Sequence, residues 1–204
     1  KKKDSQETPE IYNPLGYAKS QYHNTYIVSQ TKSGIVIVDQ HAAHERIVYE
    51  KLKKDFYNKS AKTQILLIPE IINIEKDVLE NLKDKFEIAE KYGLKIEQFG
   101  ADSIIVREVP NILSECNIKK LVLNLIDELL DFDKSELLES QINKICSSMA
   151  CHGSIRAGRE MEVDEMNDLL RRMENTPFSG QCNHGRPTYI ELDLNDIEKL
   201  FGRK

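Results

Sequence analysis

Tryptophan is absent from the sequence, and aromatic residues make up only 7% of its 204 residues. Long apolar stretches are also missing, because no run approaches the roughly 20 residues that a helix needs to cross a bilayer. The polar start, KKKDSQETPE, lacks the features of a signal peptide. We therefore expect a cytoplasmic protein without membrane contact, and we interpret residues 1–12 as a linker remnant from a longer protein.

A basic excess, which dedicated DNA-binding domains usually carry, is missing as well. The chain has 29 Lys and Arg residues against 34 Asp and Glu residues, and its formal net charge is −5. Hydrophobic residues make up 40% of the chain, which is ordinary for a globular protein with a buried core. The composition therefore predicts a globular protein that binds DNA only weakly by itself.

Cysteine is scarce, and the four cysteines are Cys116, Cys146, Cys151 and Cys182. Without a secretion signal, a disulfide framework is not expected. In a reducing compartment, thiols serve as core fillers, metal ligands or nucleophiles. Cys116 and Cys146 lie in no motif, and we assign them to packing.

The first part of the chain has the pattern of a β-sheet followed by a helix. GYAKSQYHNTYIVSQ and GIVIVDQ predict strands, with a turn at Asn24 and a tight turn at residues 32–34. The apolar spacing after them predicts a helix from Ala42 to about Tyr57. QILLI, residues 64–68, predicts a short strand that Pro69 ends.

The rest of the chain alternates helical and strand patterns. We expect an amphipathic helix over residues 75–92 that ends at Gly93, and strands in LKIEQFG and DSIIVREV. Further helices are predicted through Leu121, Leu125 and Leu129, after an Asp133–Glu136 capping box, and through Val163, Met166, Leu170 and Met173. A strand, TYIEL, and a short helix from Asn195 to Phe201 complete the pattern.

This order predicts an α+β fold with two lobes. Residues 13–62 and 149–204 form one lobe of sheet and helices. Residues 63–148 form a second lobe that is inserted into the first.

The stretch DQHAAHERIVYE, residues 39–50, places acids and histidines where a buried strand passes into a helix. His41 and Glu45 share one helix face, and Asp39 sits at the strand end just before them. Each has a simpler interpretation: Asp39 as a helix cap, His41 as a boundary histidine and Glu45 as a solvated charge. Together they favour a metal site. Glu50 points away from that face, and its spacing from Arg46 and Lys54 favours an ion pair.

A second candidate half-site is the C-x-H pair of Cys182 and His184, in a loop that Gly185 and Pro187 would turn sharply. Small residues surround Cys151, so it is either a ligand or a packed thiol. A mixed carboxylate, thiolate and imidazole set suits Zn²⁺ or Mn²⁺ and favours catalysis over a structural role. Two metals would suit phosphodiester hydrolysis. Four arginines are either phosphate contacts or ordinary surface charges: Arg156, Arg159, Arg186 and Arg203.

Four motifs in order resemble the C-terminal endonuclease domain of the MutL family of DNA mismatch repair proteins. Residues 39–50 fit DQHA-x-x-E-x-x-x-x-E, and ACHGSIRAG at 150–158 resembles the family's alanine–cysteine segment. CNHGRP at 182–187 resembles C-P-H-G-R-P, and FGR at 201–203 resembles the closing F-x-R. The resemblance covers about residues 14–204.

The resemblance implies a metal-dependent enzyme that nicks DNA, with Zn²⁺ and/or Mn²⁺ in a two-metal site. The implied metal ligands are Asp39, His41, Glu45, Cys151, Cys182 and His184. The implied catalytic residues are Asp39, His41, Glu45, Glu50 and Arg203, with Asp39 needed for cleavage, Glu45 as a bridge between metals and Arg203 organising the site.

The resemblance also implies how the domain is organised and what it meets. Residues 13–62 and 149–204 correspond to a dimerisation lobe that carries the metal site, and residues 63–148 to an external, regulatory lobe. The implied partners are a second copy of the chain, DNA, the β sliding clamp and, through the full-length protein, the mismatch-recognition protein MutS. ATP would bind only in the missing N-terminal region, and the location would be bacterial, cytoplasmic and nucleoid-associated.

Two positions depart from the family pattern, and one further segment fits it. His152 stands where the family often has Arg, and Asn183 stands where it usually has Pro, which would loosen the loop. Residues 64–69, QILLIP, fit the Q-x-x-L-x-P pattern with which MutL proteins contact the sliding clamp, through Gln64, Leu67 and Pro69. The simpler interpretation is an edge strand ended by proline.

Two other functions compete with the endonuclease. A dimerisation and docking module would hold only structural zinc, but the intact Asp39, His41 and Glu45 argue against it. An unrelated zinc hydrolase for small substrates would have a deep apolar pocket near Asp39.

Overall fold

The computed structural model describes residues 13–131, 137–153 and 159–203. It confirms the α+β class, and the described residues fall into two compact units. Unit 1 contains residues 13–43, 159–181 and 187–203, and unit 2 contains residues 44–131, 137–153 and 182–186. The division between the two units lies after Ala43, inside helix α1 (Gln40–Asn58).

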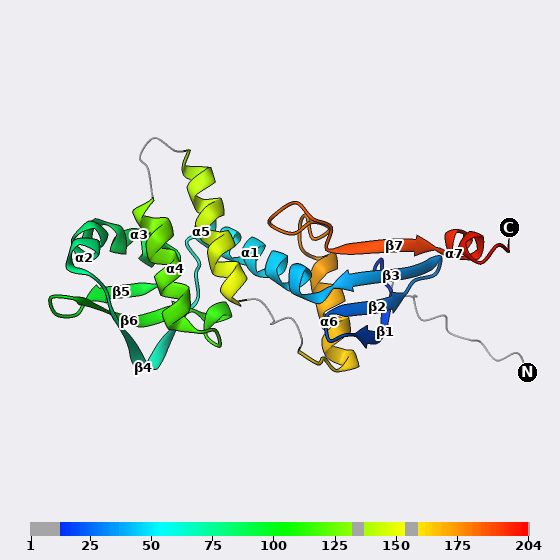
Figure 1. Cartoon of the computed structure of the whole chain (residues 1–204), viewed down its shortest axis with the longest axis horizontal. Coiled ribbons are helices and arrows are strands. Elements are labelled where there is room, and N and C mark those ends of the chain that lie inside the picture. Colours follow the sequence, from blue (N-terminus) through cyan, green and yellow to red (C-terminus); the bar gives the residue numbers. More distant parts are fainter. Residues whose placement is uncertain (1–12, 132–136, 154–158, 204) are drawn as a thin grey trace, which may run out of the picture. The chain divides into compact units, whose positions relative to one another are not determined.

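Unit 1 is built on an antiparallel sheet with the strand order β1-β2-β3-β7 (Figure 1). Its elements are β1 (Tyr17–Tyr22), β2 (Tyr26–Gln30), β3 (Gly34–Asp39), α6 (Val163–Glu174), β7 (Tyr189–Asp193) and α7 (Leu194–Leu200). β2 and β3 are rich in β-branched residues, which suit a pleated and half-buried surface. The predicted turn at Asn24 is confirmed by its left-handed φ of 49°.

One face of this sheet is buried, and α6 packs against β1 (Figure 1). Ile27, Val36 and Val38 are almost completely buried on the sheet. The predicted Met166, Leu170 and Met173 are buried on this helix together with Leu169. Val163, also predicted to be buried, is 51% exposed at the start of the helix. Burial of the other helix residues and of the sheet residues provides the main driving force for folding of unit 1.

The other face of the sheet carries an apolar row that stays partly exposed. Val28 pairs with Ile37, and Ile37 pairs with Ile190 on the next strand. Ile35 pairs with Leu192 in the same way. Ile190 is 51% exposed, and the other four are half-buried. We call these five residues the open face: Val28, Ile35, Ile37, Ile190 and Leu192.

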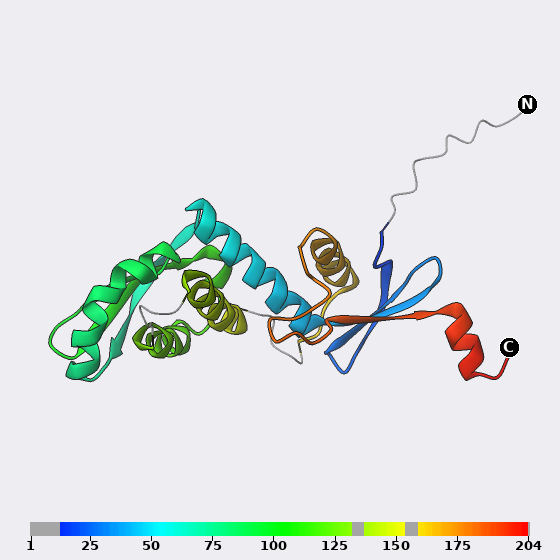
Figure 2. The ribbon, with the colours of Figure 1, turned by 90° about the horizontal axis from the view of Figure 1, so that it is seen from above.

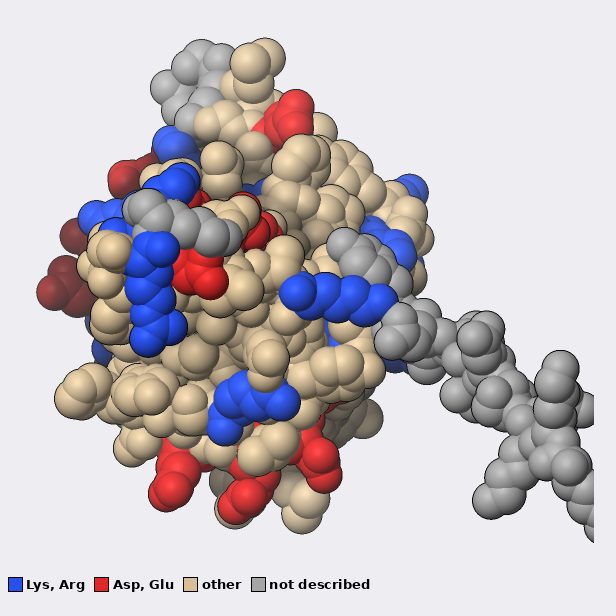
Figure 3. Space-filling model, turned by 90° about the vertical axis from the view of Figure 1, so that its right-hand side faces the viewer, with Lys and Arg blue, Asp and Glu red and all other residues tan. Residues whose placement is uncertain are grey.

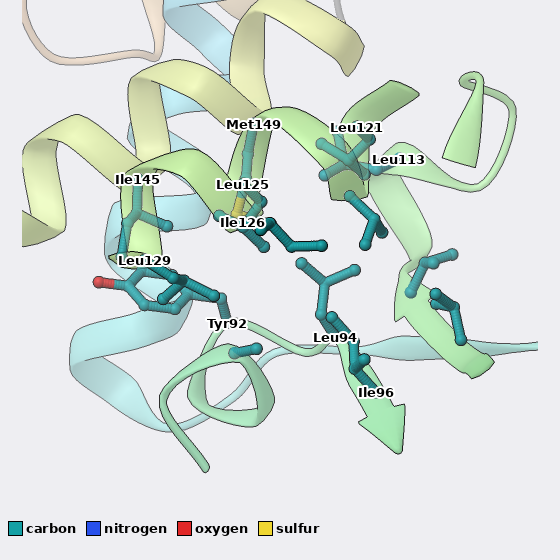
Figure 4. Packing of buried hydrophobic residues seen from close by; sticks show 14 of the residues in the cluster. Tyr92, Leu94, Ile96, Leu113, Leu121, Leu125, Ile126, Leu129, Ile145 and Met149 are labelled. Atoms are coloured by element: carbon teal, nitrogen blue, oxygen red, sulfur yellow. The ribbon is translucent and has the colours of Figure 1, made fainter. Parts of the chain in front are cut away.

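Unit 2 contains most of α1 and a sheet with the order β4-β6-β5. Its other elements are β4 (Thr63–Asn73), α2 (Lys76–Leu82), η1 (Lys83–Lys85), α3 (Phe86–Lys91), β5 (Lys95–Gln98), β6 (Ser103–Pro110), η2 (Asn111–Leu113), α4 (Ile118–Leu130) and α5 (Leu138–Gly153). Figure 4 shows α4 and α5 directing Leu125, Leu129 and Met149 toward Leu94 and Tyr92 in one apolar core.

Pro69 does not end a strand, contrary to the prediction. β4 runs on to Asn73 and bends visibly in Figure 1. Residues 66–69 fall in a shift of register between Ile65 and Glu70, where the ladder to β6 is interrupted. Because β4 is an edge strand and Pro69 lies in this bulge, the missing N–H costs no ladder hydrogen bond.

The single helix predicted over residues 75–92 is also wrong. The segment forms α2, then a turn of 3₁₀ helix at Lys83–Lys85, then α3. Leu79 and Leu82 before the break and Ala89 after it are buried. The predicted apolar positions are therefore confirmed, although the helix is not continuous. Gly93 ends the segment with a φ of 83°, as predicted.

α7 continues directly from β7 and turns away from the strand, as Figure 2 shows. It contains no buried residue, and Leu200 and Phe201 are 78% and 76% exposed. The predicted Asp133–Glu136 capping box lies outside the described residues. Within the described part of the chain, no helix is both long and apolar enough to cross a membrane.

Candidate metal centre

The junction between β3 and α1 is fixed at Asp39. Its backbone N–H donates to the carbonyl of Thr188 at 2.8 Å, which joins β3 to the start of β7. Its Oδ1 atom accepts a hydrogen bond from the N–H of Ala42 at 3.0 Å. Asp39 is therefore the N-cap of α1, the simpler of the two roles predicted for it. A carboxylate has a second oxygen, so capping is compatible with metal ligation.

Gln40 anchors the same junction from inside. It has no exposed surface, and its Nε2 atom donates to the carbonyls of Asn24 at 2.8 Å and Arg159 at 3.2 Å. Its Oε1 atom accepts a 2.6 Å hydrogen bond from Nε2 of Gln21. Gln21 in turn donates to the carbonyl of Arg159 and accepts from the N–H of Met161. This amide network holds the backbone between Asp39 and His41.

In unit 2, three elements that are distant in sequence meet at Glu45. The Cys151 thiol, from α5, donates to Oε1 of Glu45 at 2.9 Å. Nδ2 of Asn183, from the loop before β7, donates to the same oxygen at 3.1 Å. Glu45 is only 5% exposed although it is charged. Burial of a carboxylate is costly, so these two donors stabilise it.

The Cys182–His184 loop is a sharp turn, as predicted. The N–H of Cys182 donates to the carbonyl of Arg186 at 2.8 Å, and the N–H of Gly185 donates back to Cys182 at 3.0 Å. Gly185 has a φ of 77°, a conformation that glycine adopts without strain. Cys182 is 6% exposed, and His184 is exposed.

The surroundings of Cys151 determine the pKa of its thiol, which a bound cation would change. Burial, followed by the hydrogen bond to Glu45 and the negative charge of Glu45, raises the pKa of the Cys151 thiol to about 12. A bound cation reverses this effect, because it neutralises the carboxylate and binds the thiolate form. Asn183 Oδ1 is buried without a hydrogen-bond partner among the described residues, and such an atom suits a metal. Glu45 and Cys151, with the Asn183 amide beside them, are therefore the residues whose chemistry suits a cation.

The structure does not assemble the whole predicted ligand set. Among the described residues, His, Cys, Asp and Glu side chains do not gather in threes or more at distances that would hold a metal. Glu45 and Cys151 do lie together, whereas Asp39 and His41 belong to unit 1. His41 lies one turn before Glu45 on α1.

Other predicted residues have separate roles in the structure. Arg46 and Glu50 form a 2.6 Å ion pair one turn apart on α1, as their spacing predicted. His152 shares a 3.0 Å hydrogen bond with Asn124 of α4. Burial, together with the nearby Lys120, lowers the pKa of His152.

The arginines are distributed over the surface. Arg159 pairs with Glu165, and Arg203 is exposed beyond the end of α7. Arg156 lies outside the described residues. On the face shown in Figure 3, Lys and Arg side chains are separated by uncharged surface and by Asp and Glu side chains, in agreement with the acidic composition.

One contact was missed by sequence reasoning. Asn183 was expected to loosen its loop, but its side chain binds Glu45. The only signal in the sequence was its position between Cys182 and His184.

Comparison with known proteins identifies the family. Residues 19–161 match the family described as "MutL C terminal dimerisation domain", a description that implies a homodimer. The chain is 52% identical over 194 residues to DNA mismatch repair protein MutL of Nitrobacter hamburgensis, which covers 95% of the chain and 32% of the relative. It is 53% identical over 191 residues to the MutL of Brucella anthropi, covering 94% and 30%.

The MutL of Agrobacterium fabrum is 51% identical over 195 residues, covering 96% of the chain and 32% of the relative. The chain thus spans about a third of the length of these curated relatives. The match to the family covers most of the chain, and the identities are high. The chain therefore belongs to the family of MutL C-terminal dimerisation domains of DNA mismatch repair.

Proposed function

We propose that the chain is a metal-dependent endonuclease that nicks DNA during mismatch repair. The observation that carries the proposal is the buried carboxylate of Glu45, which Cys151 and Asn183 contact from two other parts of the chain. Two hydrogen-bond donors offset part of the cost of burying this acid, and a bound cation would offset more of it. The motif spacing of Asp39, at the end of β3, and His41, in the first turn of α1, supports the same function.

The six ligands proposed for Zn²⁺ and/or Mn²⁺ are Asp39, His41, Glu45, Cys151, Cys182 and His184. A bound metal supplies a Lewis acid and an activated water, and a second metal would steady the phosphate charge. Asp39, at the capped end of α1, is the carboxylate that we expect cleavage to need. Glu50 would act through Arg46, which it binds, and Arg203 would contribute its positive charge.

We also propose that β4 contacts the sliding clamp through Gln64, Leu67 and Pro69. The bulge supports this proposal, because Leu67 is 101% exposed and Ile68 is 85% exposed. Apolar side chains exposed in this way are typical of a binding segment. A clamp contact would hold an acidic domain on DNA by raising its effective concentration there.

The open face of unit 1 is the surface that we propose for pairing with a second copy of the chain. Its apolar residues lie side by side across three strands. In a two-fold dimer this one patch would face the same patch of the second copy. Residues 63–148 would form the regulatory lobe. MutS contact, nucleoid association and ATP binding in a region outside this chain are proposed from the relatives' role in mismatch repair.

The test is nicking of supercoiled plasmid in Mn²⁺, with and without the sliding clamp, by the chain and by Asp39→Asn. Asparagine also caps helices, so the variant should fold normally and lose nicking. Nicking by the unaltered chain that Asp39→Asn retains would contradict the assigned site. If neither protein nicks even with the clamp, while the chain holds zinc, the domain is a docking module with structural zinc.

A further inference from the structure

Asn183 is held against Glu45 in one orientation. Its Nδ2 atom donates to Oε1 of Glu45 at 3.1 Å. An ionised carboxylate only accepts hydrogen bonds, so the amide must turn its NH₂ group toward Glu45. The opposite orientation would bring the Asn183 carbonyl oxygen against a negative charge. Glu45 therefore determines where the Oδ1 atom of Asn183 lies.

That Oδ1 atom is buried, and no described residue donates a hydrogen bond to it. Buried polar atoms are rarely left without a partner, and each exception calls for an explanation. The two polar atoms of one amide are close together, so Oδ1 lies near the carboxylate that Nδ2 contacts. Oε1 of Glu45 thus accepts hydrogen bonds from the Cys151 thiol and from the Asn183 amide, and Oδ1 belongs to that same amide group.

We infer that Asn183 Oδ1 is a metal ligand at Glu45, and that it shifts the preference of the site from Zn²⁺ toward Mn²⁺. The inference rests on the proposed metal dependence and specifies which metal this chain favours. Carbonyl and carboxylate oxygens suit Mn²⁺, whereas thiolate and imidazole suit Zn²⁺. Each oxygen ligand added to a mixed set therefore favours Mn²⁺.

The inference depends on asparagine at position 183. The family motif C-P-H-G-R-P has proline at this position, and proline has no side-chain oxygen or N–H. With asparagine, the loop between Cys182 and His184 gains both a donor to Glu45 and a free acceptor.

The experiment measures the affinity of the chain for Mn²⁺ alone and for Zn²⁺ alone, by calorimetry and competition with a chelator. Asn183→Ala should weaken Mn²⁺ binding on the order of tenfold, the usual effect of losing a group that supports a metal site. Zn²⁺ binding should change much less. Asn183→Asp keeps an oxygen at this position, so its Mn²⁺ affinity should equal or exceed that of the unaltered chain.

The matched control is Asn117→Ala. Asn117 also lies in unit 2 and caps α4 by accepting a 2.9 Å hydrogen bond from the N–H of Lys120, so its loss should cost some stability without affecting either metal. Equal losses for both metals in Asn183→Ala, or no loss, would overturn the ligand assignment. If the unaltered chain binds neither metal, the proposed metal-dependent function fails together with this inference. If it binds both and only the Asn183 effect is missing, this inference fails alone.

Discussion

The Cys151 thiol lies 2.9 Å from Oε1 of Glu45, although 106 residues separate the two in the sequence. The contact joins α1 to the end of α5, so two long helices hold the pair in place. Side chains fixed by rigid elements form more precise sites than side chains on loops. In the proposed metal site, Glu45 and Cys151 would be two of the ligands, with Cys151 as a thiolate.

If two copies of the chain pair through the open face, a charge placed on that face should convert the dimer into a monomer. Ile190→Lys should be tolerated by the folded monomer, because Ile190 is 51% exposed. In the dimer the ammonium group would be buried, at a cost of at least about 2 kcal/mol, or about thirtyfold in the dissociation constant. Light scattering during size-exclusion chromatography over a concentration series measures this change.

The control for that variant is Leu123→Lys. Leu123 is a 37% exposed leucine on α4 of unit 2, so the same kind of change occurs outside the open face. It should leave the dimer intact. An Ile190→Lys protein that remains as dimeric as the control would show that the chain pairs through another surface.

Two neighbouring leucines in the β4 bulge should respond differently to substitution, one in clamp binding and the other in stability. Leu67 is 101% exposed, whereas Leu66 is partly buried against the core of unit 2. Leu67→Ala should weaken clamp binding and leave the melting temperature unchanged. Leu66→Ala should cost about 1–2 kcal/mol of stability, because it removes core contacts. Fluorescence anisotropy with labelled clamp and thermal unfolding separate the two effects, and unchanged clamp affinity in Leu67→Ala would exclude this segment.

Much of the fold was predictable because the apolar periods are strong. The spacing of Leu121, Leu125 and Leu129 predicted α4, and these leucines are buried. The errors arose where tertiary structure overrode local preference. Pro69 predicts the end of a strand, but its edge position lets the strand continue. The tighter turn at Lys83–Lys85 has no residue that marks it in the sequence.

The candidate site was less predictable, because its contacts join distant segments. The helical spacing of His41 and Glu45 is visible in the sequence, since both lie on one helix. The contact between Asn183 and Glu45 spans 138 residues and depends on how the loop folds back. Sequence patterns show local periodicity. They do not show which distant segments the fold brings together, so a contact of this kind could not be predicted from them.

The amide network at Gln40 predicts that Gln21, which lies in no motif, supports the metal site. Gln21→Met fills similar space but leaves the buried Oε1 of Gln40 without its donor, at a cost of about 1–3 kcal/mol. Because Gln40 lies between Asp39 and His41, Mn²⁺ affinity should also fall, by about tenfold. Urea unfolding and Mn²⁺ titration measure the two effects.

Gln30→Met provides the comparison, since Gln30 is an exposed glutamine on the neighbouring strand β2. Gln30→Met should change neither the free energy of unfolding nor the affinity for Mn²⁺. If Gln21→Met lowers stability but binds Mn²⁺ like the unaltered chain, the network has a structural role only.

The last prediction concerns alkaline pH and Cys146, a thiol with no exposed surface in the core of unit 2. Burial raises its pKa from 9.0 to about 12, an effect that nearby Lys53 reduces. As pH rises from about 9 toward 12, the unfolded chain loses this proton while the folded chain retains it. The folded state then binds more protons, so its stability must fall over this range.

Cys146→Ala removes this contribution. The variant should be about 1 kcal/mol less stable at pH 8, because a small cavity replaces the sulfur. Its stability should then decline less steeply than that of the unaltered chain between pH 8 and pH 10.5. Burial also raises the pKa of Tyr92, so part of the decline should remain. Urea unfolding at the two pH values tests this expectation, and parallel declines in both proteins would show that Cys146 ionises as freely in the folded chain as in the unfolded one.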